Sequence, residues 1–428
     1  MNMKKIFVSA YACEPGLGSE IGVGWHWVLE LSKYFEVWVL TRESNRGTIV
    51  PWIEQHKEYE NIHFVYFDLP QWARRWKRGM RGVRLYYMLW QWLSNGVVKR
   101  TMQENGIEVY HLLTYGNAMW PASRYGMKQR FVWGPVSAGV SLPRYLTKHF
   151  SLKSRMKEAA QRAMKWLLPL NMGFRTRCRC ADVILCKTDE TIECVPRKWR
   201  YKCVQMTDVA VELRDAEIYM LPKRYDEAKV NYVMAGTLVG WRTVDVLLES
   251  WKLCQQTIDN SQQSTVNRQQ TTVDCRLSTV DYRLTIVGNG PERGRLEGLI
   301  RELGIEDSVR LVGQVDMETY YSYIAQADAV VNSCFREGAV TVSFDAMAMG
   351  KPLICFDTGG YTHYFEPEYS RVIKGVKSRE EAVERLAQAM VELADKELCA
   401  KMGAEAKRRS EELSWEKKIK GLQSMVYS

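Results

Sequence analysis

Two carboxylates eight positions apart are the residues best suited to chemistry in the second half of the chain. They are Glu337 and Asp345. Four residues that we expect at the start of a helix follow Glu337: Gly338, Ala339, Val340 and Thr341. The N–H groups of such a start attract an anion, helped by the helix dipole. If these N–H groups bind phosphate and the two carboxylates accept hydrogen bonds from sugar hydroxyls, the stretch is a nucleotide-sugar site. The alternative is a helix that packs on a sheet, with a solvated Glu at its start.

The elements around these carboxylates favour ligand binding. The apolar run 329–333 predicts a buried strand, and 340–349 has helical spacing. Gly350 and Pro352 stand where this helix should stop. Glu337 is therefore expected at the carboxyl end of a parallel strand, where open α/β sheets bind their ligands.

Three further loops carry glycines after predicted strands. Gly22 and Gly24 follow the strand 5–9, Gly236 and Thr237 follow 231–235, and Gly288 and Gly290 follow 284–287. Glycine lets backbone approach a phosphate closely. The first loop lacks the dinucleotide spacing, and Thr41-Arg42 stands where that motif has an acid. A nicotinamide dehydrogenase is therefore disfavoured.

The alternation of strands and helices predicts an α/β protein with two doubly wound, Rossmann-like domains. The chain of 428 residues, 46% of them hydrophobic, is long enough for both. We place the domains at 1–215 and 216–412, with a closing helix at 413–428 that returns to the first domain. The strand 181–188 is expected to be the last of the first half. A near-repeat rich in Gln, Ser and Thr, at 255–282, is interpreted as a mobile, non-catalytic surface insertion.

The formal net charge of +10 suggests an anionic partner. Residues 71–100 hold basic and aromatic residues and no acid, including Arg74, Arg75, Lys77 and Arg78. A second basic stretch runs from 144 to 179. This mixture is typical of helices at an anionic membrane surface, although it also fits a solvated basic face with buried aromatics. Nucleic acid is disfavoured, because no recognition motif accompanies the charge.

The remaining sequence signals concern location and metals. We see no signal peptide and no apolar run long enough to cross a bilayer, which predicts a cytoplasmic protein, peripheral at the inner face of the cell membrane. The scattered cysteines are interpreted as reduced core residues. No cysteine spacing or carboxylate cluster suggests a metal, so neither a metal nor a cofactor is expected.

Taken in order, several motifs resemble the retaining family-four glycosyltransferases of the GT-B fold. They include Gly288-Asn289-Gly290-Pro291-Glu292, the segment from Glu337 to Asp345, Leu413-Ser414-Trp415, Gly22-Val23-Gly24-Trp25 and Trp133-Gly134-Pro135-Val136. The resemblance covers nearly the whole chain and is most specific in the second half.

The resemblance also implies roles for individual residues. Glu337 would hold sugar hydroxyls, Gly338 to Thr341 would offer N–H groups, and Asp345 would accept from the ribose, where the family usually has Glu. The family usually has an Arg and a Lys where this chain has Thr237 and Arg242. Arg242 would stabilise the departing diphosphate, and Thr237 brings no charge.

The function implied is transfer of a hexose from a nucleotide diphosphate-sugar, with retention and without metal. The acceptor would be a growing, lipid-linked glycan of a capsule or lipopolysaccharide. The alternative is a catalytically weakened GT-B protein that binds nucleotide-sugar, glycan or a partner without transfer, and Thr237 motivates it. A GT-B epimerase is disfavoured, because no acid/base residues for it are evident.

Overall fold

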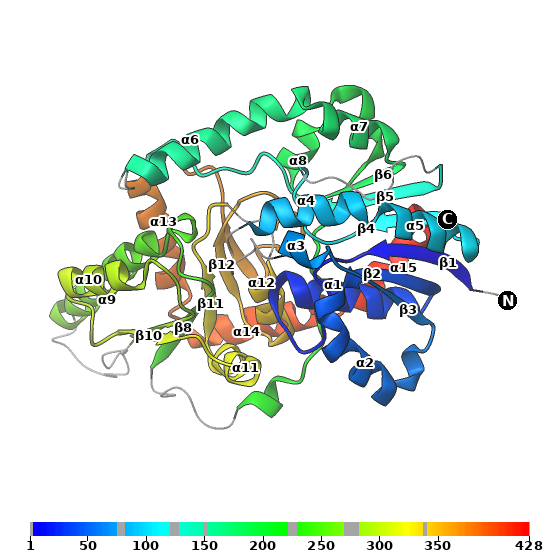
Figure 1. Ribbon diagram of the computed structural model, residues 1–428. Coiled ribbons are helices and arrows are strands. Elements are labelled where there is room, and N and C mark those ends of the chain that lie inside the picture. The colour runs from blue at the N-terminus through cyan, green and yellow to red at the C-terminus, as the bar shows by residue number, and fades with distance from the viewer. Residues whose placement is uncertain are drawn as a thin grey trace. The chain divides into compact units, whose positions relative to one another are not determined.

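The computed structural model describes residues 3–74, 82–119, 128–148, 150, 152–220, 229–268, 282–336 and 340–427 (Figure 1). The chain forms two compact units. Unit 1 comprises Met1–Val140, Gln161–Val209 and Trp415–Ser428, and unit 2 comprises Ser141–Ala160 and Ala210–Ser414.

Unit 1 is built on a parallel sheet. Its strands, in spatial order, are β3 (Ile62–Phe67), β2 (Phe35–Arg42), β1 (Lys4–Ser9), β4 (Val109–Leu112), β5 (Arg130–Val136), β6 (Val183–Cys186) and β7 (Cys203–Gln205). The expectation that the strand at 181–188 is the last was wrong, because Ile184 of β6 pairs with Cys203 of β7. A strand of three half-buried residues has no alternation that the sequence could reveal.

Helices cover both faces of this sheet (Figure 1). Those of unit 1 are α1 (Ser19–Ser32), α2 (Arg46–Gln55), α3 (Gln71–Arg74), α4 (Val83–Leu93), α5 (Asn95–Glu104), α7 (Met172–Cys180), α8 (Asp189–Cys194) and α15 (Trp415–Val426). The last of them, α15, packs on α1 through Trp415, whose ring stacks on His26 with centroids 5.8 Å apart. The chain therefore ends on its first helix.

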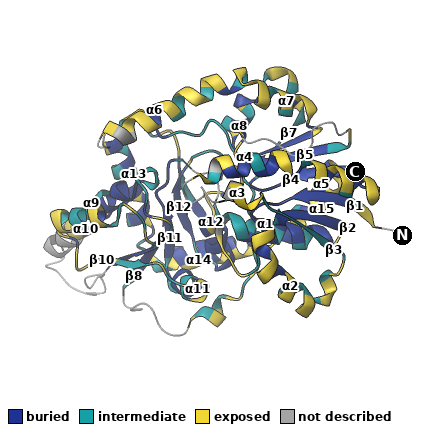
Figure 2. Ribbon diagram, viewed as in Figure 1, coloured by how far each residue is buried: buried dark blue, intermediate teal, exposed yellow. Residues whose placement is uncertain are grey.

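Unit 2 repeats the pattern with six parallel strands. In spatial order they are β10 (Val309–Gly313), β9 (Tyr282–Val287), β8 (Val230–Ala235), β11 (Ala329–Asn332), β12 (Leu353–Phe356) and β13 (Ser370–Ile373). The helices are α9 (Val244–Arg268), α10 (Arg293–Leu303), α11 (Met317–Gln326), α12 (Thr341–Ala348), α13 (Arg379–Glu392) and α14 (Lys396–Ser410). Its central strands, β9, β8, β11 and β12, are almost wholly buried, as expected for a parallel sheet covered on both faces, whereas the edge strands β10 and β13 are partly exposed (Figure 2).

The segment 141–160 belongs to unit 2, although it was expected within the first domain. Leu142 and Leu146 are fully buried in the core of unit 2, and the Tyr145 hydroxyl donates to the carbonyl of Val376 at 2.8 Å. Helix α6 (Leu152–Leu167) begins in this segment and ends in unit 1. The division between Val209 and Ala210 lies close to the boundary expected at 215.

The insertion expected at 255–282 begins as helix rather than loop. Helix α9 continues to Arg268, because no Gly or Pro interrupts its 25 residues and Gln and Asn tolerate a helix interior. Residues 269–281, with most of the near-repeat, lie outside the described residues.

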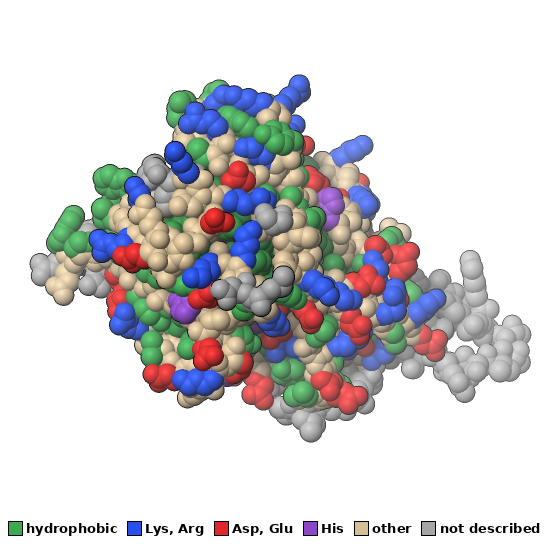
Figure 3. Space-filling model, turned by 90° about the vertical axis from the view of Figure 1, so that its right-hand side faces the viewer, with side chains coloured by type: hydrophobic (Ala, Val, Ile, Leu, Met, Phe, Trp, Pro, Cys, Tyr) green, Lys and Arg blue, Asp and Glu red, His purple; other side chains and the backbone are tan. Residues whose placement is uncertain are grey.

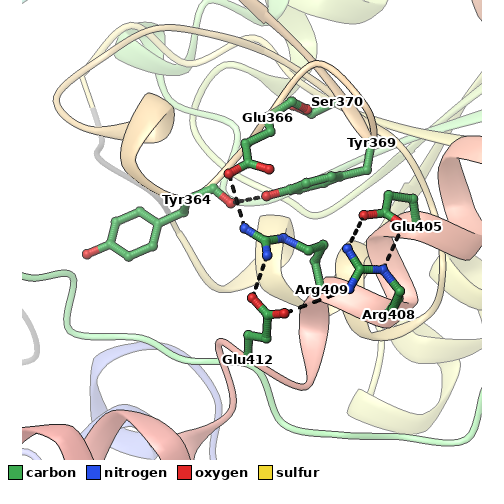
Figure 4. Close-up of polar contacts among 8 residues, drawn as sticks. All are labelled: Tyr364, Glu366, Tyr369, Ser370, Glu405, Arg408, Arg409 and Glu412. Atoms are coloured by element: carbon green, nitrogen blue, oxygen red, sulfur yellow. Dashed lines mark hydrogen bonds and ion pairs between the residues drawn. The ribbon is translucent and has the colours of Figure 1, made fainter.

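An ion-pair network on α14 lies at the surface of unit 2 (Figure 4). Arg409 contacts Glu366 at 3.1 Å and Glu412 at 2.5 Å, and Arg408 contacts Glu405 at 2.5 Å. The Arg408 side chain is 61% exposed. Exposed pairs of this kind are screened by solvent and contribute little to stability, so the network is a solvated surface feature.

Candidate functional site

Two glycines bring the loops after β8 and β9 into backbone contact. Gly236 and Gly288 have φ of +150° and +140°, which disfavour any other residue. A Cβ added at Gly288 would stand 2.0 Å from the carbonyl oxygen of Gly236. The glycine-rich loops predicted at 236 and 288 therefore do meet, at the carboxyl edge of unit 2.

A third glycine fixes the loop that follows Thr237. A Cβ at Gly290 would stand 2.3 Å from the carbonyl oxygen of Leu238. The N–H of Leu238 donates to Asn289 at 3.1 Å, and the N–H of Glu292 donates to Leu238 at 3.1 Å. These contacts hold the loop 236–243, and so the residues it carries.

Arg242 lies inside this arrangement. It ends the 3-10 helix η7 (Gly240–Arg242), and its guanidinium lies beside Gly236, where an added Cβ would stand 2.5 Å from Nη1. The Cζ atom is 5.2 Å from the ring centroid of Trp241. The guanidinium thus rests between a glycine and an indole at the end of β8.

The residue after Arg242 ties the loop to β11. Thr243 has φ of +49°, an unfavourable value for a β-branched residue. Its hydroxyl donates to the carbonyl of Ser333, and the Ser333 hydroxyl donates to the carbonyl of Arg242 at 3.0 Å. This φ value costs about 1–3 kcal/mol of backbone strain, and the two reciprocal hydrogen bonds stabilise it. Such strain often accompanies functional sites.

A second arginine, for which no role was predicted, contacts the same indole. Arg336 follows β11 and has its Cζ 5.6 Å from the ring centroid of Trp241. Its Nη1 donates to Oε1 of Glu158 on α6 at 3.0 Å, and the two side chains are 19% and 5% exposed. An arginine between a buried strand and a helix start is the signal that could have revealed it.

Asp345 lies inside unit 2, on α12. It is 4% exposed, and the Tyr320 hydroxyl of α11 donates to its Oδ2 at 2.7 Å. Burial raises the pKa of Asp345 to about 7, while the Tyr320 hydrogen bond and the charge of Arg214 act in the opposite direction. The carboxylate therefore titrates near neutral pH, and its contact with a ribose stays a prediction.

The other predicted donor residues divide between several places. Val340 is the N-cap of α12 and Thr341 begins it, whereas Glu337, Gly338 and Ala339 lie outside the described residues. Thr237 is exposed directly after Gly236.

Gly22 and Gly24 lie in unit 1, on α1. A Cβ at either would stand about 2 Å from a carbonyl oxygen, 2.0 Å from Leu17 and 2.1 Å from Ala12. Close packing thus requires both glycines, and their part in donor binding stays a prediction. Of the predicted membrane residues, Arg74 ends α3, and Arg75, Lys77 and Arg78 lie outside the described residues.

Unit 1 has a small, partly open hollow at the carboxyl edge of its own sheet. Its polar lining includes Glu20, Lys187 and Asp208. Lys187 pairs with Asp208, and Glu20 accepts from the N–H of Gly116 at 3.2 Å. Because its carboxylates are negative and its lysine is already paired, this lining is better suited to bind hydroxyl groups than to bind phosphate groups.

Residues 215–409, nearly all of unit 2 after its first segment, match the sequence profile of glycosyl transferases group 1. The curated lipopolysaccharide core biosynthesis glycosyltransferase LpsD of Rhizobium meliloti (strain 1021) is 39% identical over 69 residues. That alignment spans 16% of this chain and 20% of LpsD, so it concerns a short segment of each.

Solved glycosyltransferase structures resemble the whole chain. Anabaena Alr3699/HepE in complex with UDP covers 99% of this chain and 100% of its own, with a TM-score of 0.58 and 14% identity. It was also solved with UDP-glucose. WaaG, a glycosyltransferase involved in lipopolysaccharide biosynthesis, gives the same coverage, TM-score and identity. At this identity the likeness concerns the fold, and the predicted GT-B fold with two Rossmann-like domains is confirmed.

Proposed function

We propose that the protein is a retaining family-four glycosyltransferase that moves a hexose from a nucleotide diphosphate-sugar to a growing glycan. The observation that carries this proposal is the guanidinium of Arg242, fixed between Gly236 and Trp241 at the carboxyl edge of the family-matched unit. A fixed guanidinium suits phosphate, which it binds through two parallel N–H donors.

The proposed reaction breaks the bond between the anomeric carbon and the diphosphate oxygen. The electron pair leaves with the diphosphate, and Arg242 stabilises the charge that develops there. An acceptor hydroxyl attacks the anomeric carbon from the face that the diphosphate leaves, which retains the configuration, and its proton passes to the departing phosphate oxygen. The arginine supplies the charge that a metal would otherwise bring, so we propose metal independence.

We infer the chemical class of the donor and of the acceptor from the residues at the two sheet edges and from the similar proteins. UDP and UDP-glucose bound to HepE favour a uridine diphosphate-hexose. We assign the acceptor to the carboxyl edge of unit 1 around this hollow, where Glu20 and Asp208 can accept hydrogen bonds from sugar hydroxyls. The names LpsD and WaaG favour lipopolysaccharide-type assembly.

A membrane-facing surface would suit a lipid-linked acceptor. Large apolar side chains at the end of α6, in η4 (Leu168–Leu170) and at the start of α7 are exposed: Trp166 (80%), Leu167 (60%), Leu170 (70%) and Met172 (76%). Residues 159–181 contain no acid, and Figure 3 shows basic beside hydrophobic side chains at the top of the molecule, where α6 and α7 lie in Figure 1. This mixture favours peripheral binding to anionic lipid. In the described residues, no helix has the length and apolarity of a membrane span.

The decisive experiment is a transfer assay with UDP-, GDP- and ADP-hexoses and a glycolipid extract as acceptor, with and without EDTA. The proposal expects one donor to be consumed at the same rate in EDTA and the product to keep the anomeric configuration. Arg242→Gln and Glu337→Ala should strongly reduce transfer, and Arg310→Gln, at an exposed position of β10, should not. An inverted product, or loss of activity in EDTA, contradicts the corresponding part of the proposal.

A second candidate, binding without transfer, is favoured by Thr237. This exposed, uncharged residue follows Gly236, where the family usually has a cation. UDP binding that depends on Arg242, with no turnover on any acceptor fraction, would establish this candidate in place of the first.

A further inference from the structure

We propose that Arg336, positioned by Glu158, is a second cation of the diphosphate site and supplies the charge that Thr237 lacks. The inference rests on the proposed nucleotide diphosphate-sugar chemistry and adds one residue to it. Sequence position gives no hint of the pair, because Glu158 and Arg336 are 178 residues apart.

Arg336 lies at the same indole as Arg242. The Cζ atoms of the two arginines stand 5.6 and 5.2 Å from the ring centroid of Trp241, so they are less than 11 Å apart. Glu158 is the counter-ion of Arg336, and like charges this close in a partly buried place favour an anion that contacts both. Two guanidiniums at one ring therefore form a site that suits an anion of the size of a diphosphate.

The backbone beneath the arginines is fixed. The Cys334 thiol lies 3.8 Å from the carbonyl oxygen of Trp241 and donates to it, and the N–H of Arg336 donates to the Cys334 sulfur at 3.4 Å. With the reciprocal contacts of Thr243 and Ser333, these bonds join the loop after β8 to the loop after β11. The backbone segments that carry the two arginines thus keep a set separation, which contributes to the preorganisation that charge stabilisation requires.

Glu158 orients the Arg336 guanidinium and leaves most of its N–H donors available. Among the described residues, the Arg336 side chain makes one hydrogen bond, from Nη1 to Glu158. A guanidinium has five N–H donors, so the remaining ones can meet phosphate oxygens. The Oε2 atom of Glu158 is buried and has no hydrogen-bond partner in the described part of the chain. A brace built for stability alone would be expected to satisfy both oxygens.

The test compares the binding of UDP with that of uridine, because the difference isolates the diphosphate. We expect Arg336→Gln to weaken UDP binding about tenfold, the effect of one lost charged contact, and to leave uridine binding unchanged. Arg336→Lys should retain part of the affinity, because it keeps the charge but not the fork. Glu158→Gln should weaken UDP binding less than Arg336→Gln does, and Arg310→Gln should not change it. Thr237→Arg in the Arg336→Gln background should restore UDP affinity.

Thermal melting of each variant separates this role from a structural one. If Arg336→Gln and Arg336→Lys lower the melting temperature while both bind UDP like the wild type, the pair is a brace and the inference is overturned. If the wild type binds UDP through Arg242 and Arg336 but transfers no sugar, the inference stands and the proposed transfer fails. If the wild type binds neither UDP, GDP nor inorganic pyrophosphate, both are overturned.

Discussion

The two sheets share one strand pattern, yet their carboxyl edges present opposite chemistry. In unit 1 the cations are paired, since Lys187 contacts Asp208 and Lys418 donates to the carbonyls of Thr207 and Val209. In unit 2 the guanidiniums of Arg242 and Arg336 both rest against the Trp241 ring, and Arg336 also pairs with Glu158. The scaffold thus sets where a ligand can bind, and the loops set which ligand it is.

Burial sharpens this difference. Burial lowers the pKa of Lys418 to about 7, although the charge of Asp208 acts in the opposite direction. This lysine of unit 1 is therefore only partly charged near neutral pH. An arginine keeps its charge in the same situation, because its pKa is too high for burial to neutralise it. Because its cations are arginines, the carboxyl edge of unit 2 keeps its positive charge when it is buried.

The largest expected effect is that of Arg242→Gln on the cationic edge. Loss of a fixed donor to the developing charge should lower kcat about 10²–10³-fold, equivalent to about 3–4 kcal/mol. Steady-state kinetics with the preferred donor measure it, with Arg310→Gln as the matched control. A reduction below about threefold would mean that the charge at the end of β8 does not act on the reaction.

Next in size is the effect of Gly288→Ala on the scaffold beneath that edge. The added methyl group would meet the Gly236 carbonyl at 2.0 Å, at a φ of +140°, so we expect the free energy of unfolding to fall by about 3 kcal/mol. Urea denaturation measures it. The control is Gly298→Ala on α10, where nothing lies within 4 Å of the added atom and helix propensity should raise stability by about 0.5–1 kcal/mol. Equal effects of the two substitutions would contradict the packing argument.

How far the sequence predicts this molecule depends on the range of the contacts. Strand and helix periodicity located β8, β11 and α12 within a few residues, because burial on both faces leaves long apolar runs. The glycines at 236 and 288 were recognised for the same local reason. The contact of Glu158 with Arg336 was not, and neither was the place of Leu142 in unit 2, because periodicity identifies a buried face but not the element that covers it.

A smaller, pH-dependent effect is expected at Asp345. Because its folded pKa is raised from 3.8 to about 7, the unfolded chain loses this proton first, and the stability of the wild type should fall relative to Asp345→Asn as pH rises from about 4 to 7. If the ionised carboxylate accepts from the ribose, UDP affinity should also rise about tenfold between pH 6 and 8. Calorimetry of both proteins measures this. The phosphate titrates as well, so the wild-type increase must exceed that of Asp345→Asn, and parallel curves would remove Asp345 from the site.

The smallest expected effect is that of Lys187→Met on UDP binding. Lys187 is already paired with Asp208, so the carboxyl edge of unit 1 has little charge to offer a phosphate, and we expect UDP affinity to change less than twofold. The same variant should raise KM for the acceptor, because the freed Asp208 carboxylate no longer keeps its orientation in the hollow. A loss of UDP affinity comparable to that of Arg242→Gln would show that both edges bind phosphate. That result would support the donor-binding role that the sequence predicts for Gly22 and Gly24, which lie on α1 next to Val23 of the same hollow.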